Sequence, residues 1–72
     1  MDDMIIAYKG VTIKLQPTKL RDGGWMADFT LYEENESAIN LTPYHGKNVY
    51  ASRGEAKLAA FNSAREIIDE RH

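Results

Sequence analysis

The chain has no cysteine, and this absence excludes several kinds of chemistry at once. Disulfides, thiolate metal sites and cysteine nucleophiles all need a residue that the sequence does not contain. Histidine is also scarce, because His45 is the only histidine besides the terminal His72. No histidine pair has the spacing of a metal site, and no serine lies in a Gly-x-Ser-x-Gly motif. We therefore expect no catalytic residue, no metal site and no bound cofactor, and we interpret His45 as an exposed loop residue.

Long apolar runs and an excess of basic charge are missing as well. No stretch approaches the roughly 20 apolar residues of a membrane-spanning helix. The N-terminus, Met1-Asp2-Asp3, is acidic where a secretory signal would be basic. These features predict a cytoplasmic protein without a membrane partner. The net charge of −2 argues against a strongly basic nucleic-acid-binding surface.

The length of 72 residues limits the chain to a single small domain, residues 1–72. A domain of this size buries only roughly 60% of its unfolded surface, so its stability is modest. Burying further surface in a dimer would help materially.

What the sequence does contain is one clear helix signal near its end. Ser52 followed by Glu55 forms a capping box, and residues 56–71 contain neither Gly nor Pro. At about 100° per residue, one apolar stripe forms on this helix. Its members are Ala56, Ala60, Phe61, Ala64, Ile67 and Ile68. The alanines predict a close approach to a sheet built by the preceding residues.

Strand patterns fill the first half of the chain. The runs 4–8 and 11–16 are separated only by Lys9-Gly10, which predicts a tight hairpin with Tyr8 opposite Val11. Residues 25–32 alternate at period two and predict a third strand. The apolar residues of the run 11–16 and of the strand 25–32 face one core only if the loop around Asp22-Gly23-Gly24 holds an odd number of residues.

An acidic turn, residues 33–37, precedes a short fourth strand in which Ile39 and Leu41 alternate with polar residues. Pro43 ends this strand or marks it as an edge. Residues 44–48 are expected to form an exposed loop, and residues 49–51 lead extended into Ser52. The predicted fold is α+β: a four-stranded antiparallel meander with one C-terminal helix packed on one face.

Covering one face leaves the other face of the sheet to water or a partner. Residues expected on this open face include Lys14, Met26 and Tyr32, and Leu58 lies on the polar side of the helix. These four residues form the candidate interface. They predict a non-enzymatic interaction module that binds itself, as a homodimer, or another protein, through a sheet face or edge.

A nucleic-acid-binding or regulatory role is the alternative interpretation. Lys47, Arg53 and Lys57 flank the predicted helix start, where backbone N–H groups favour a phosphate. The overall acidity makes this role less favoured than the interaction module.

Several short motifs together resemble a known family. They are Tyr8-Lys9-Gly10 with Ile13, Gly23-Gly24-Trp25, Ser52 with Glu55-Ala56, and Ile67-Ile68-Asp69-Glu70. The chain is similar to a family of short cytoplasmic bacterial proteins, some labelled HlyU-type transcriptional activators and many uncharacterised. The family's arginine-containing middle segment is replaced here by Asn40-Leu41-Thr42-Pro43-Tyr44. The resemblance implies no catalytic residue.

Overall fold

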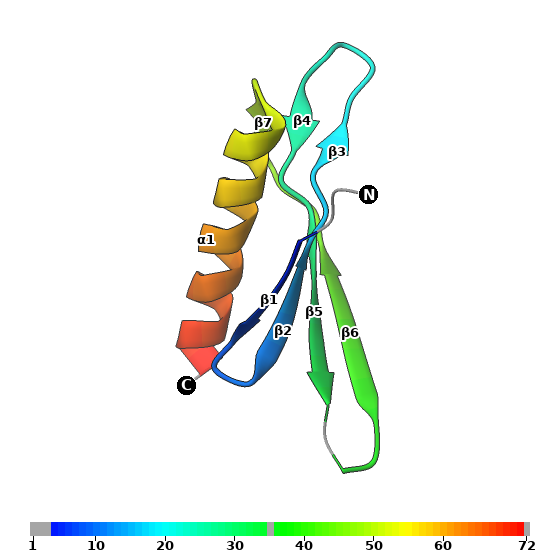
Figure 1. The fold of residues 1–72 in the computed structure, drawn as a ribbon, viewed down its shortest axis with the longest axis vertical. Helices are drawn as coiled ribbons and strands as arrows, with labels where there is room; N and C mark the ends of the chain where they lie inside the picture. Colours follow the sequence, from blue (N-terminus) through cyan, green and yellow to red (C-terminus); the bar gives the residue numbers. More distant parts are fainter. Residues whose placement is uncertain (1–3, 35, 72) are drawn as a thin grey trace.

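The computed structural model describes residues 4–34 and 36–71, which form two small antiparallel sheets and a C-terminal helix (Figure 1). The larger sheet has four strands in the order β1-β2-β5-β6, and the smaller has three in the order β3-β4-β7. Their bounds are β1 Met4–Tyr8, β2 Val11–Leu15, β3 Thr18–Lys19, β4 Trp25–Met26, β5 Phe29–Glu34, β6 Ile39–Tyr44 and β7 Val49–Tyr50, and the helix α1 spans Arg53–Arg71. The predicted α+β class and C-terminal helix are confirmed, whereas a single meander is only roughly right.

The first hairpin follows its predicted register. Tyr8 pairs with Val11 and Ile6 with Ile13. Lys9 and Gly10 both have positive φ, 49° and 81°, as the turn of a two-residue hairpin requires. Glycine adopts such a conformation without strain, which explains its place in the turn.

The predicted strand 25–32 is divided in the structure. β4 and β5 are separated by Ala27 and Asp28, although both continue one long hairpin with β2 and β3 in the same register. Between them the Gln16 N–H bonds the Asp28 carbonyl at 2.9 Å, which continues the register of the hairpin beyond β2. The interruption turns the end of the hairpin into the separate sheet β3-β4-β7. The predicted odd parity is nevertheless confirmed, since Ile13 pairs with Leu31.

The segment between β6 and β7 forms a bulge opposite Ala27 and Asp28, at the point where the two sheets meet. Phe29 pairs with Tyr44 and Met26 with Val49, so residues 45–48 lie opposite only two residues. Gly46 packs directly on Ala27, where an added Cβ would lie 2.9 Å from the Ala27 nitrogen. Of the segment predicted to be an exposed loop, His45, Lys47 and Asn48 are exposed, whereas Tyr44 and Gly46 are half-buried.

Tyr44 in particular belongs to β6 and is half-buried. Its ring stacks on Phe29 with 4.9 Å between centroids.

The core lies between α1 and the sheets. α1 packs against β2, β4, β5 and β7. The alanines of its predicted stripe and Ile68 are fully buried with the inward side chains of β2 and β5, while Phe61 and Ile67 of the same stripe are half-buried. The buried residues are Val11, Ile13, Leu15, Ala27, Phe29, Leu31, Ala56, Ala60, Ala64 and Ile68. The predicted helix stripe is confirmed.

Both ends of α1 are held by side chains. At the start, the Ser52 Oγ accepts the Glu55 N–H at 3.2 Å, and Glu55 reaches back to accept the Ala51 N–H at 3.2 Å. At the far end, Asp69 accepts hydrogen bonds from the Lys9 ammonium at 2.7 Å and the Tyr8 hydroxyl at 2.9 Å. These bonds, the one from Lys9 first, hold the pKa of the Asp69 carboxyl below its usual value.

The contact between helix and sheet predicts different effects of the same substitution at two nearby positions of α1. Ala60→Leu forces a larger side chain against a buried wall, which costs typically about 1–3 kcal/mol. Asn62→Leu places the same side chain on the exposed face and leaves stability nearly unchanged. Thermal unfolding followed by circular dichroism measures both, and equal midpoints would contradict docking through the alanine row.

The capping box makes a smaller, local prediction. Ser52→Ala removes the acceptor for the Glu55 N–H and destabilises the protein by roughly 1 kcal/mol. Ser52→Asp, which keeps an acceptor, serves as the control and retains stability. Denaturant titration compares the three proteins. A Ser52→Ala protein as stable as the original would show that the cap contributes nothing.

The bulge predicts that position 46 does not tolerate even a methyl group. Gly46→Ala brings its Cβ against the Ala27 backbone and is expected to cost about 1–3 kcal/mol, as overpacking does. Gly54→Ala is the matched control, because no atom lies within 4 Å of its added Cβ and alanine favours a helix. Unfolding in urea should separate the two variants, and similar midpoints would refute the close contact.

Candidate interaction surface

The face of the larger sheet that points away from α1 is the main candidate surface. Four residues connect the paired residues Glu34 and Ile39, so even-numbered residues of β5 pair with odd-numbered residues of β6. As a result Ile39 and Leu41 point to the side of Tyr32, away from the buried Leu31. Ile5 reaches the same side from β1, opposite Lys14. We call this side the open face.

Large apolar side chains are exposed on the open face. Ile5, Ile39 and Leu41 retain 66%, 65% and 58% of their accessible surface. Isolated apolar residues on a surface need no explanation, but three on one small sheet face form an exposed apolar patch.

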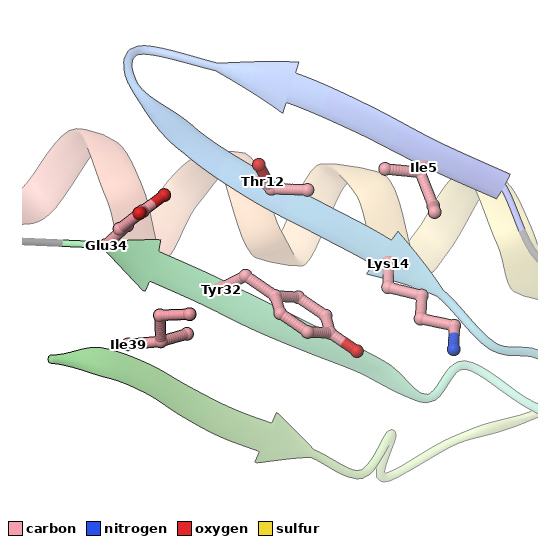
Figure 2. A pocket seen from close by; sticks show the side chains of 6 residues that line it. All are labelled: Ile5, Thr12, Lys14, Tyr32, Glu34 and Ile39. Carbon is pink, nitrogen blue, oxygen red and sulfur yellow. The ribbon is translucent and has the colours of Figure 1, made fainter.

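A shallow groove of about 370 Å³ runs diagonally across the open face (Figure 2). It is lined by three cross-strand pairs: Ile5 with Lys14, Thr12 with Tyr32, and Glu34 with Ile39. Figure 2 shows the first pair at one end, the second in the middle and the third at the other end, with the helix behind the sheet.

The groove therefore combines opposite charges with apolar side chains. A cation and an isoleucine occupy one end, an anion and an isoleucine the other, and two hydroxyl-bearing side chains the centre. Exposed apolar area, a half-buried tyrosine and charges at the rim are typical of protein-binding surfaces.

The four predicted interface residues do not form one surface. Lys14 and Tyr32 line the groove, as their positions in alternating strands predicted. Met26 lies in the smaller sheet, half-buried between Thr18 and Val49. Leu58 is 62% exposed on α1, beside a hollow of about 170 Å³ near β1.

Sequence reasoning missed four other residues of the open face: Ile5, Glu34, Ile39 and Leu41. The even number of residues between Glu34 and Ile39 is the signal that places the last two there.

The predicted basic residues lie in separate places. Lys47 borders a hollow of about 270 Å³ beside the bulge. Lys57 borders the hollow near β1 with Leu58. Arg53 is half-buried at the first residue of α1 and already interacts within the chain. No hollow described among residues 4–34 and 36–71 gathers all three residues.

His45 lies next to Asp28 at the junction between the sheets. Its Nδ1 is 3.6 Å from Asp28 Oδ1, which is too long for a hydrogen bond, and its side chain is 80% exposed. Asp28 instead accepts the Thr18 hydroxyl at 2.7 Å and the Gly46 N–H at 3.2 Å, so it holds the bulge in place. The described residues contain no cluster of three or more potential metal ligands.

Within the described parts of the chain, no helix combines the length and apolar character that crossing a bilayer requires.

Comparison with known proteins places the chain in a family without assigning it an activity. No curated protein and no solved structure matches it. The HlyU label and a bacterial origin stay predictions. A family model described as a domain of unknown function (DUF6566) matches residues 1–72, and the chain belongs to this family.

Proposed function

We propose that the protein is a small non-enzymatic interaction module that self-associates through its open face, in the cytoplasm of a bacterium. The observation that carries this proposal is the exposure of Ile5, Ile39 and Leu41 around one groove on the face that α1 leaves uncovered. Removing such apolar area from water yields roughly 25 cal/mol per Å², so covering it contributes favourably to binding.

The face is favoured over an edge for a physical reason. β6 is one edge of the larger sheet, and Pro43 within it has no N–H to offer a further strand. β1, the other edge, has only five residues. Short edge strands and proline both discourage strand addition. Association through side chains of the open face has neither obstacle.

Small size supports self-association as well. A domain of 72 residues gains little from its own core, and apolar area buried between two copies adds to its stability. Stability linked to association rises with protein concentration.

Two exposed leucines allow a matched test. Leu41→Lys places a charge on the open face, whereas Leu58→Lys places one on α1, away from that face, at similar exposure, 58% against 62%. Sedimentation velocity over a range of concentrations should show dimers of the unmodified protein and of Leu58→Lys, and monomers of Leu41→Lys. A monomeric unmodified protein at every concentration, or loss of the dimer only in Leu58→Lys, would refute the proposal.

A further inference from the structure

The groove on the open face carries a charge pattern that matches itself when it is reversed. Its ends are Ile5 with Lys14 and Ile39 with Glu34, and its centre is Thr12 with Tyr32. Each end pairs one isoleucine with one charge, and the two charges have opposite signs.

We propose that the partner is a second copy of this chain, bound face to face about a two-fold axis that crosses the groove at Thr12 and Tyr32. This inference rests on the proposed function and specifies its geometry. Such an axis lays the Lys14 end of one copy over the Glu34 end of the other. The pair between Lys14 and Glu34 of the other copy then forms twice, Ile5 meets Ile39 twice, and Tyr32 faces its own copy. An interface of this kind uses the same patch on both subunits, as two-fold symmetry requires.

The charges explain why one orientation is selected. If the two grooves met with equal ends together, Lys14 would face Lys14 and Glu34 would face Glu34. Like charges placed together disfavour binding, whereas complementary charges fix orientation and register. Lys14 also interacts within its own chain, but an ammonium group has three donors and can serve a second acceptor.

The diagonal course of the groove decides how the sheets cross. Since the groove passes from β1 to β6 across all four strands, aligning two grooves end to end makes the strands of the two copies cross steeply. This arrangement belongs to the orthogonal class of sheet packing.

The size of the face sets the conditions for the experiment. Strands of five or six residues, about 3.3 Å per residue and about 4.8 Å apart, give a footprint of roughly 300–400 Å². Specific interfaces bury roughly 800 Å² on each partner, so the dimer is weak. Association must therefore be measured from micromolar to about millimolar chain concentration.

Charge exchange tests the arrangement directly. Lys14→Glu and Glu34→Lys should each weaken the dimer roughly tenfold or more, because like charges then meet at both ends. The double variant Lys14→Glu/Glu34→Lys restores both opposite-charge pairs and should dimerise like the unmodified protein. An equimolar mixture of the two single variants should also associate, as a heterodimer, more tightly than either variant alone. Sedimentation equilibrium measures the dissociation constants, and circular dichroism checks that each variant is folded.

The outcomes separate this inference from the proposed function. Weakening by each single variant, with recovery in the double variant and in the mixture, supports the reversed face-to-face dimer. A different outcome is a dimer that Leu41→Lys prevents, while the single charge variants bind as tightly as the unmodified protein or the double variant does not regain its affinity. That outcome would show that the open face is used but that this arrangement is wrong. An unmodified protein that never dimerises overturns both proposals.

Discussion

The contact between the alanine row of α1 and the sheet is the constraint on which the rest of the structure depends. Ala56, Ala60 and Ala64 are fully buried. A larger side chain at these positions would hold the helix farther from β2 and β5. A single helix in such close contact covers one face of a narrow sheet and leaves the other uncovered. Among the described residues α1 is the only helix, so the open face and its exposed isoleucines lie on the side of the sheet that α1 does not cover.

The bend between the two sheets depends on a second close contact. Gly46 packs on the Ala27 backbone, and Asp28 accepts hydrogen bonds from Gly46 and Thr18 around the same point. This junction separates β4 from β5. It lets α1 contact both sheets, because β4 and β7 continue the surface that begins with β2 and β5. His45, interpreted from the sequence as an exposed loop residue, lies beside Asp28 at this junction.

Local patterns predicted the parts of the fold that depend on neighbouring residues. The Lys9-Gly10 turn fixed the first register, the Ser52 and Glu55 pair fixed the start of the helix, and helical periodicity identified the buried stripe. The division of residues 25–34 was not predictable in this way. It depends on a bulge that lies about twenty residues farther along the chain, and an alternating pattern looks the same whether or not the strand is interrupted.

The candidate surface was half predictable for a related reason. Lys14 and Tyr32 follow from strand alternation, and both line the groove. Ile39 and Leu41 were missed because apolar residues in a short strand suggest a core position. The parity argument that correctly joined β2 to β5 assigns them to the other face when it is applied to the four residues after Glu34. An even connection turns the alternation over, so the apolar side of β6 faces outward.

This inversion has a consequence for how β6 interacts. Its apolar side chains point to the open face, while Pro43 interrupts the backbone groups along its outer edge. A strand with this combination is protected against unlimited edge-to-edge pairing, which leads to aggregation, but still exposes apolar area on the open face of the sheet. In the proposed dimer, contact through the face is closed by two-fold symmetry after two copies, whereas contact through edges can continue from copy to copy. The sequence of β6 therefore favours a finite assembly over an extended one.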